Sequence, residues 1–530
     1  MRTQLQSYSP DLSPARAAED RAALKNPQTS WDVLVIGGGI TGVGVALDAA
    51  SRGLRVALVE SRDLAFGTSR YSSKLVHGGL RYLASGHLGI AWESAVERHH
   101  LMTSIAPHLV SPMAQVVPAY GAPAGVGRLA SVRAAADGFL GSAIVGAGFA
   151  FGDLLRRGAR TPAGVLGRPE HVSSDEVIAA CPQVAPNGLH GGWRSFDGQL
   201  IDDARLVVAV ARTAASHGAA ICTRIRADDV TGSGAQLTDV DSGESFRVQA
   251  RTVINATGVW AGTVDDSIHI RPSRGTHLVF DAATFGHPTA ALTIPVPGHR
   301  SRFVFAMPQQ LGRVYVGLSD EDAPGPIPDE SVPSENEIDY ILDTLNTALA
   351  TPVSRADVIG SYSGLRPLIE ADGDTADLSR EHAVGINATG LISVVGGKLT
   401  TYRKMAADAV DAAVTKGRLD AYPCVTESIP VIGAHGPRDP RLPASLLARY
   451  GGEARRVVDM ATVSSPLAPI ARGIDVTRAE IEFAVTCEGA TDVDDILHRR
   501  TRIGLVEADA TRCRPAITHI LDQLGAAHSA

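Results

Sequence analysis

The chain has 530 residues, of which 44% are hydrophobic and 20% are charged. At roughly 150 residues a domain, this length predicts about two to four domains with a sizeable core. The net charge of −8 argues against a general nucleic-acid-binding protein, so an anionic ligand would need a local basic pocket. The five cysteines are scattered and form no C-x-x-C pair, which predicts neither a disulfide framework nor a zinc or other metal site and fits a reducing cytosol.

The N-terminal segment 1–30 is polar and lacks the apolar core of a signal peptide. It contains Pro10, Pro14 and Pro27, and prolines disfavour a continuous regular element. We therefore expect a flexible N-terminal extension before the first strand.

A strand–turn–helix–strand unit begins at Trp31. The apolar run 33–36 leads into Gly37-x-Gly39-x-x-Gly42, a helix of small residues follows, and a second apolar strand ends at Glu60. In this order the three glycines allow a tight turn, a close approach of the backbone to a pyrophosphate and close helix–strand packing. The phosphates would lie over the helix N-terminus, and Glu60 would accept hydrogen bonds from the adenosine ribose. The unit predicts a dinucleotide site.

The elements after this unit are less distinctive. A loop rich in Ser and Gly occupies 66–80, a helical pattern follows over 91–106, and the stretch 121–166 carries no chemistry that we can assign. A helix is then predicted over 201–217 and a strand over 219–225, from the spacing of apolar residues.

No segment has the length and apolar character of a membrane span. The uncharged run 104–127 contains four prolines, and the run 138–152 is shorter than the roughly 20 residues that a spanning helix needs. The second run is either a buried helix or a surface that dips into a membrane, where the basic residues at 156–160 would suit anionic headgroups. We expect a cytoplasmic protein, either free or peripheral on the cytoplasmic face of the membrane.

Two further strand–glycine turns occur in the second half of the chain, around Gly258 and around Gly396 and Gly397. The second of them leads into a predicted helix over 399–414. Between the turns lie a helix that begins at a capping box of Ser334 and Glu337 and several short β-like segments, at 276–280, 291–295, 303–307 and 314–318. After a proline-containing linker near 423–443 the pattern is helical to the end.

Three strand–glycine turns, at Gly37, Gly258 and Gly396, are thus separated by a β-rich block. This order indicates a nucleotide-binding domain that the chain leaves and enters again. A split domain of this kind is more typical of flavin proteins than of simple NAD dehydrogenases, whose nucleotide unit is usually continuous.

From Trp31 to Val506 the chain resembles the FAD-dependent (respiratory) glycerol-3-phosphate dehydrogenases, within the glycine/D-amino-acid oxidase group of flavoproteins. The run Ser-Ser-Lys-Leu-Val-His-Gly-Gly-Leu-Arg-Tyr at 72–82 is the most specific motif, whereas the first glycine turn would fit any flavoprotein of the group. The resemblance rests on motifs at 35–42, 72–82, 201–206, 274–277, 362–367, 396–403 and 494–502.

This resemblance implies an α/β fold with a split, Rossmann-like FAD-binding domain, a substrate domain on a mixed sheet and an all-helical C-terminal domain. The expected boundaries are 31–110, 195–265 and 360–420 for the FAD-binding domain, 111–194 and 266–359 for the substrate domain, and 430–530 for the C-terminal domain. The implied reaction is oxidation of sn-glycerol 3-phosphate to dihydroxyacetone phosphate by hydride transfer from C2 to the flavin N5. FAD would be bound non-covalently, a quinone would accept the electrons, and the protein would be a peripheral membrane protein and a homodimer.

The resemblance also assigns roles to residues near the substrate. His277 would be the base that takes the proton of the C2 hydroxyl, with His77 as the competing candidate. Arg366 would polarise the C2 oxygen or clamp the substrate, because arginine remains charged and binds oxyanions through a planar fork. The substrate's phosphate and the rest of the pocket would be contacted by Arg380, Lys398, Arg81 and Tyr82.

The remaining assigned residues would hold FAD. Gly396 and Gly397 would bring backbone N–H groups to the N1–C2=O edge of the flavin, where negative charge develops on reduction. Gly258 would close the turn near the adenosine half, and His77 would lie beside the isoalloxazine. The loop that follows the cofactor would contribute Thr68, Ser69, Ser73 and Lys74.

Several alternatives remain open from the sequence. An oxidase that passes electrons to O₂ would differ from a quinone-dependent dehydrogenase in the access to its cavity and in local charge. No sequence motif distinguishes the two. An amine-oxidising enzyme of the same group would need an Arg–Tyr pair for a carboxylate, but the additional cations Lys74, Arg81 and Lys398 favour a phosphate. A flavin-binding scaffold without catalysis would tolerate loss of Arg366. An NAD-dependent enzyme is disfavoured because the chain has a single Gly-x-Gly-x-x-Gly unit.

Overall fold

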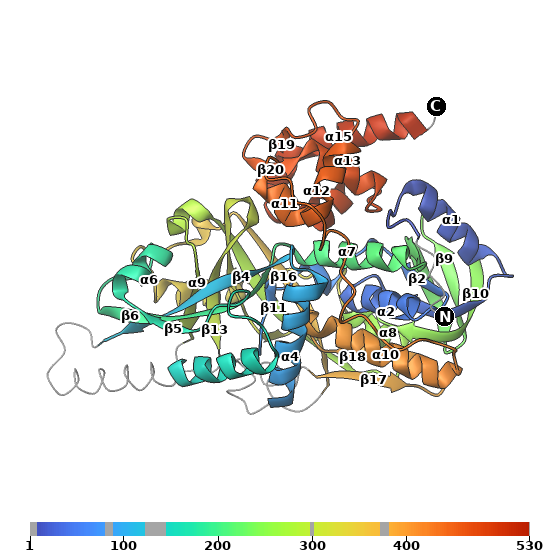
Figure 1. The fold of residues 1–530 in the computed structure, drawn as a ribbon, viewed down its shortest axis with the longest axis horizontal. Helices are drawn as coiled ribbons and strands as arrows, with labels where there is room; N and C mark the ends of the chain where they lie inside the picture. Colours follow the sequence, from blue (N-terminus) through green and yellow to red (C-terminus); the bar gives the residue numbers. More distant parts are fainter. Residues whose placement is uncertain (1–7, 80–87, 122–144, 297–301, 371–380, 529–530) are drawn as a thin grey trace.

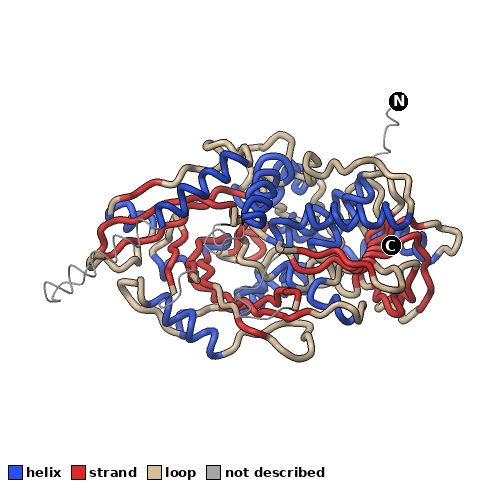
Figure 2. Tube along the Cα trace, turned by 90° about the horizontal axis from the view of Figure 1, so that it is seen from below, coloured by secondary structure: helices blue, strands red, loops and turns tan. Residues whose placement is uncertain are grey.

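The computed structural model describes residues 8–79, 88–121, 145–296, 302–370 and 381–528. Figure 1 shows two large sheets at opposite ends of an elongated molecule, with the C-terminal helices above the junction between them. Seen from below, the strands of both sheets flank a central region crossed by helices and loops (Figure 2).

The first sheet is the nucleotide-binding sheet that the glycine turns predict. Its five strands β18, β10, β1, β2 and β7 pair in parallel, and β17 adds an antiparallel edge. Because β18, β10 and β1 are neighbours, the three glycine turns that follow them meet at one edge of the sheet. In sheet order the strands are β17 (His382–Ile386), β18 (Ile392–Gly396), β10 (Ser245–Asn255), β1 (Trp31–Ile36), β2 (Val56–Glu60) and β7 (Ala220–Thr223).

Both faces of this sheet are covered, which explains why its strands are apolar throughout rather than alternating. One face carries three helices, α2 (Ile40–Ser51), α7 (Asp203–Ser216) and α10 (Tyr402–Gly417). Gly44 lets α2 approach α10 closely, since a Cβ there would lie 2.8 Å from the Tyr402 ring. The other face carries a meander of β8 (Ile225–Thr231), β9 (Gly234–Asp239) and the first half of β10.

From residue 8 onward, where the structure describes it, the N-terminal segment is not the flexible extension that we expected. Residues Pro14–Lys25 form helix α1, capped by the Ser13 side chain, and Leu24 packs into the core behind β1. The preceding residues reach the C-terminal unit, where the N–H of Leu12 donates to the carbonyl of Cys487 at 3.0 Å. Long-range contacts, which a local pattern does not reveal, order this segment.

The second sheet is mixed, as predicted for the substrate domain, and only β12 and β4 pair in parallel among its described strands. Helix α9 (Glu335–Asn346), with the predicted capping box, and α6 (Ser174–Ala180) cover one face. In sheet order its strands are β15 (Glu321–Asp322), β11 (Ile270–Asp281), β14 (Arg313–Gly317), β13 (Phe303–Gln309), β12 (Ala291–Pro295), β4 (Val110–Tyr120), β6 (Leu189–Leu200) and β3 (Leu75–Val76), with β16 (Gly360–Ile369) beside β11 and β5 (Glu170–Val172) beside β6.

Two expected boundaries shift because strands of the second sheet run further than anticipated. Strand β6 extends to Leu200, so residues 195–200 belong to this sheet and not to the nucleotide-binding domain. Strand β16, placed in the range 360–420, pairs with β11 over ten residues. Strand β3, within the expected range 31–110, likewise pairs with β6 in the second sheet.

The C-terminal unit packs its own apolar core, in which Ile481, Ile496 and Ile517 are buried. Its helices are α11 (Ala444–Tyr450), α12 (Ala454–Asp459), α13 (Arg478–Thr486), α14 (Val493–Asp495) and α15 (Glu507–His528). A small hairpin of β19 (Pro469–Ala471) and β20 (Ile474–Thr477), which we did not expect, interrupts the helical pattern. Within the described residues, no helix combines the length and hydropathy that crossing a membrane requires.

Candidate active site

A cavity of about 940 Å³ lies where the glycine turns of the first sheet face the second sheet. This volume is near the upper end of the usual range of ligand pockets, so the cavity has room for an extended cofactor. Most of the predicted site residues in the described part of the chain line it, namely Gly37, Gly39, Glu60, Thr68, Ser69, Ser73, His77, Gly258, His277, Arg366, Gly396, Gly397 and Lys398.

The first glycine turn leaves the N-terminus of α2 open to the cavity. Gly37 has a φ of +112°, and a Cβ there would lie 2.7 Å from the carbonyl oxygen of Ala256. Gly42 does not line the cavity; a Cβ there would lie 1.9 Å from the carbonyl oxygen of Gly37, so the residue serves the turn–helix packing. Gly39 is the N-cap of α2, and the N–H groups and dipole of a helix start favour a phosphate.

Glu60 is fixed in place at the end of β2. Its Oε2 accepts a hydrogen bond from the N–H of Gly38 at 2.7 Å, and its Oε1 accepts one from the N–H of Arg62 at 2.8 Å. Burial raises the pKa of this carboxyl group, and the two hydrogen bonds oppose that rise. The carboxylate is therefore oriented beside the glycine turn, at the position that suits a ribose.

The loop after Glu60 follows the cavity wall. The Ser69 hydroxyl accepts a hydrogen bond from the N–H of Ile40 at 2.9 Å, in the first turn of α2. Thr68 donates its hydroxyl hydrogen to the carbonyl of Leu365 in β16 at 2.6 Å. The loop thus joins the two sheets along one side of the cavity.

The third glycine turn has two successive residues in the left-handed region, Gly396 at φ +75° and Gly397 at φ +67°. A Cβ at Gly397 would lie 2.4 Å from the Met405 sulfur, so the turn tolerates no side chain there. The N–H of Gly397 donates to the carbonyl of Glu381 at 3.3 Å. That N–H is engaged within the protein in this structure, and the donation of both N–H groups to the cofactor stays a prediction.

His277 lines the opposite wall of the cavity and is only 1% exposed. Its ring stacks on Tyr362, with centroids 4.8 Å apart, and Nε2 lies 3.0 Å from the Ser73 hydroxyl. Nδ1 is buried from solvent and has no hydrogen-bond partner within the described residues. Burial, reinforced by the positive charges of Lys74 and Arg366, lowers the pKa of His277 well below its usual value. The imidazole is therefore neutral at pH 7.

Arg366 extends from β16 across the neighbouring strand β11, directly over Gly275. A Cβ at Gly275 would lie 2.1 Å from Nη2 of this arginine. Its Nη1 donates to the Ser273 hydroxyl at 3.1 Å and to the carboxylate of Asp320 at 3.0 Å. We did not identify Ser273, Gly275 or Asp320 as site residues, because their roles depend on strand register and no local motif marks Asp320.

The remaining predicted residues differ in whether they reach the cavity, which Lys398 does. Lys398 donates to the Ser94 hydroxyl at 2.5 Å, which links the third glycine turn to helix α4 (Leu88–His100). Lys74 was expected to contact the cofactor but is not among the cavity-lining residues. The expected substrate contacts Arg81, Tyr82 and Arg380 lie outside the described residues.

Lys74 has a structural role. Its ammonium group lies 3.0 Å from the carboxylate of Asp203 and donates to the carbonyls of Arg70 and Ser72 at 3.1 and 3.0 Å. The same group lies 4.4 Å from the centre of the Tyr362 ring, on which His277 stacks. Burial lowers the pKa of Lys74 to about 8. Lys74 therefore packs against Tyr362 and, through this ring, supports His277.

The residues present fit a two-ended cofactor such as FAD. One end of the cavity has the glycine-capped helix N-terminus and Glu60, which match a pyrophosphate and a ribose. His277, Arg366 and the third glycine turn also line the cavity, and they would hold the flavin, which would supply the redox chemistry.

Comparisons with known proteins agree with this arrangement. A model of the FAD-dependent oxidoreductase family matches residues 32–403, and one of the C-terminal domain of alpha-glycerophosphate oxidase matches residues 424–527. The chain is 58% identical to glycerol-3-phosphate dehydrogenase 1 of Mycobacterium tuberculosis, over 96% of this chain and 98% of that protein. It is 32% identical to the mitochondrial glycerol-3-phosphate dehydrogenase of Bos taurus, over 97% of this chain and 72% of that one.

A solved structure shares the fold. The glycerol-3-phosphate dehydrogenase from Bacillus halodurans, complexed with FAD, superposes with a TM-score of 0.70 over 96% of this chain and 97% of that chain, at 23% identity. The glycine-rich, two-walled cavity, the matching family models and the full-length relatives lead to one assignment. The chain belongs to the FAD-dependent glycerol-3-phosphate dehydrogenase family, and its cofactor is FAD.

Proposed function

We propose that this protein oxidises sn-glycerol 3-phosphate at C2 to dihydroxyacetone phosphate and passes the electrons to a quinone. The observation that carries the proposal is the pairing of a buried, neutral His277 with Arg366 on the wall that faces the glycine turns. Bound FAD supplies the hydride acceptor. The printed names of the relatives support the substrate.

His277 is suited to take the proton of the C2 hydroxyl. In the neutral ring one nitrogen carries a proton and the other can accept one, and the tautomer decides which. The Ser73 contact and the Tyr362 stack hold the ring plane fixed. Since a base contributes to the rate only when it lies within hydrogen-bond reach of the proton, this rigidity is part of the mechanism.

Arg366 and Lys398 supply the positive charge that a phosphorylated alcohol requires. The hydrogen bonds that Arg366 donates to Asp320 and Ser273 hold its guanidinium plane in one orientation. Lys398 lines the same cavity from the third glycine turn. Anchoring the phosphate and the C2 oxygen in this way removes translational freedom before the chemical step.

The experiment that tests the activity is an anaerobic titration followed by its visible spectrum. We expect sn-glycerol 3-phosphate to bleach the flavin band of the purified protein, and glycerol and D-amino acids to leave it unchanged. Bleaching by a D-amino acid instead would favour the amine-oxidising alternative. No bleaching by any of them would refute the proposed function.

The same sample separates the two electron acceptors. After anaerobic reduction, a soluble quinone should restore the flavin band rapidly, whereas air should restore it slowly. Rapid recovery in air with release of hydrogen peroxide would favour the oxidase. The predicted homodimer stays a prediction, which light scattering on the same preparation checks.

An exposed apolar surface supports peripheral membrane contact, which we include in the proposal. Leu88 and Trp92 on α4 are exposed, as are Phe151 and Leu154 on the helix over 145–158. The two helices touch, since a Cβ at Gly158 would lie 2.7 Å from the Trp92 ring. This described part of the uncharged run 138–152 is therefore not buried.

Such a surface beside exposed arginines suits an anionic bilayer. Arg157 is 57% exposed on the same helix. We expect the protein to sediment with vesicles that contain anionic lipid, and a Trp92→Ser, Phe151→Ser variant to remain in the supernatant. Val332→Ser, at a single exposed apolar residue elsewhere, is the control. Equal sedimentation of all three proteins would refute this role.

A further inference from the structure

Two loops build the adenosine end of the cavity. The first follows β2, and its residues Ser61, Arg62 and Phe66 line the cavity beside Glu60. The second is the connection from β7 to β8 at Arg224 together with the start of β8, whose residues 225–228 line the same end. The backbone N–H of Arg224, in this connection, donates to the carbonyl of Arg62 at 2.9 Å, so the two loops are joined.

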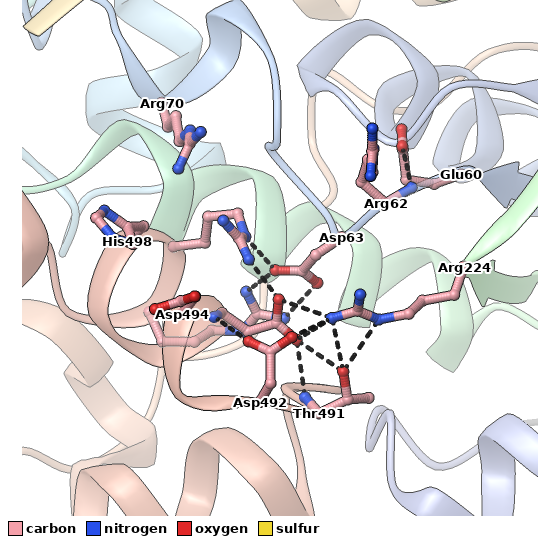
Figure 3. A network of polar contacts seen from close by, with 12 residues as sticks. Glu60, Arg62, Asp63, Arg70, Arg224, Thr491, Asp492, Asp494 and His498 are labelled. Carbon is pink, nitrogen blue, oxygen red and sulfur yellow. Dashed lines mark hydrogen bonds and ion pairs between the residues drawn. The ribbon is translucent and has the colours of Figure 1, made fainter. Parts of the chain in front are cut away.

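One segment of the C-terminal unit, residues 491–502, contacts both loops (Figure 3). We call it the clamp segment. It contains α14 and a π-helical turn, η9 (Ile496–Arg500), and π-helical turns are frequent at functional sites. No residue of this segment lines the cavity among the described residues.

The contact with the first loop is a buried ion pair between Asp63 and two successive arginines. Arg499 donates from Nε to Oδ2 of Asp63 at 2.6 Å, and Arg500 donates from Nη1 to Oδ2 at 2.9 Å and from Nη2 to Oδ1 at 3.0 Å. Asp63 is 2% exposed. Further along the same loop, Arg502 donates to the carbonyl of Arg70 at 2.5 Å, next to Thr68 and Ser69 of the cavity wall.

The contact with the second loop is made by Arg224, which has a left-handed backbone with φ +59°. Its Nη2 donates to the carboxylates of Asp492 at 2.5 Å and Asp495 at 3.2 Å. Burial alone would raise the pKa of Asp495, but the positive charges of Arg499 and Arg500 outweigh burial and lower that pKa to about 2. Asp495 is therefore charged at pH 7 and joins the two contacts into one network.

We propose that the clamp segment positions the two loops that receive the adenosine half of FAD, so that the C-terminal unit controls how tightly the cofactor is held. A loop that is already ordered loses less conformational freedom when a ligand binds. Asp63 and Arg224 are positioning residues in this scheme, since neither lines the cavity. The inference rests on FAD as the cofactor and is independent of the substrate.

A second set of buried ion pairs provides a matched control. Glu453, also in the C-terminal unit, accepts hydrogen bonds from both terminal nitrogens of Arg212 in α7, at 2.7 and 2.8 Å. This pair joins the same two parts of the molecule, but neither residue lines the cavity or belongs to the two loops. Loss of either ion pair should destabilise the contact between the C-terminal unit and the rest of the molecule. Only loss of the Asp63 pair should lower the affinity for FAD.

The test compares the full-length holoenzymes of wild type, Asp63→Asn and Glu453→Gln. Dilution releases FAD, which is followed by the rise of its fluorescence. We expect the dissociation constant for FAD to rise at least tenfold in Asp63→Asn and less than twofold in Glu453→Gln. Added FAD should restore the activity of Asp63→Asn, with the KM for glycerol 3-phosphate unchanged.

Equal release of FAD from both variants, or wild-type retention by Asp63→Asn, would overturn the proposal. If Asp63→Asn does not fold, Arg499→Lys takes its place, because it keeps the charge and loses the two-nitrogen fork. Arg499→Lys should also weaken FAD binding several-fold, and a wild-type dissociation constant in this folded variant would equally overturn the proposal. Thermal unfolding of each protein after FAD removal separates cofactor loss from general instability.

Discussion

Gly275→Ala should disable catalysis by displacing Arg366. The new Cβ would lie 2.1 Å from Nη2, 2.7 Å from Cζ and 3.0 Å from Nη1 of this arginine. An ordinary contact of about 3.4 Å or more therefore requires the guanidinium to move by roughly 1 Å or more, since β11 and β16 are held in register on both sides. A displacement of about 1 Å at a substrate-binding group can cost roughly 10²-fold in rate.

The assay is steady-state turnover of sn-glycerol 3-phosphate with a soluble quinone. We expect kcat/KM to fall by about 10²-fold while the flavin content stays near that of the wild type. Gly385→Ala, in β17, is the control, because nothing lies within 4 Å of a Cβ there. A double-mutant cycle with Arg366→Ala gives a second check, since Gly275→Ala should cost little once the arginine is removed. Wild-type turnover by Gly275→Ala, or full additivity in the cycle, would refute this reasoning.

The remaining predictions concern the two titratable groups beside Tyr362. His277→Asn should lower kcat/KM by about 10²- to 10⁴-fold, as expected for loss of a general base, while FAD stays bound as judged by absorbance. In the wild type the acid limb of kcat/KM should lie below pH 6.5, because burial, Lys74 and Arg366 lower the pKa of His277; a limb above pH 6.5 that vanishes in His277→Asn would contradict this. Burial lowers the folded-state pKa of Lys74 from 10.5 to about 8. Between about pH 8 and 10.5 the unfolded chain binds more protons at this lysine than the folded chain does. The free energy of unfolding therefore rises with pH, by about 1.4 kcal/mol per pH unit and by roughly 3 kcal/mol in all. Urea titrations of wild type and Lys74→Met at pH 7.5 and 10 measure how far the free energy of unfolding of each protein changes with pH. An equal change in both proteins would show that Lys74 does not contribute.

The sequence predicted those elements whose signal is local. The turns at Gly37, Gly258 and Gly396 follow buried strands, and all three strands are neighbours in one sheet. Strand β12 has the predicted bounds, 291–295, because Pro and Gly delimit a short apolar run. The capping box at Ser334 likewise marks the start of α9. In each case, the information lies within about ten residues.

Contacts between distant residues could not be predicted in this way. Asp320 reaches Arg366 only through the register of β11 with β15 and β16. Asp63 and Arg500 are 437 positions apart in the chain, and each would pass for a surface charge in the sequence. The order of Leu12 and α1 depends on Cys487 in the C-terminal unit. A buried charge gives no local signal of its partner, so these features appear only once the chain is folded.

The loop from Asp63 to Leu75 connects the parts of the molecule. Ser72 donates to Asp203 at the start of α7, Ser73 contacts His277 in the second sheet, and the Arg70 carbonyl accepts from Arg502 in the C-terminal unit. A substitution at any of these positions must therefore satisfy partners in different units at once. Because one end of this loop lies beside Glu60 and the other contacts His277, we expect cofactor retention and the placement of His277 to depend on the same backbone. Variants at Ser73 should thus act mainly on turnover through His277, whereas Asp63→Asn, at the other end of the loop, should act on FAD retention.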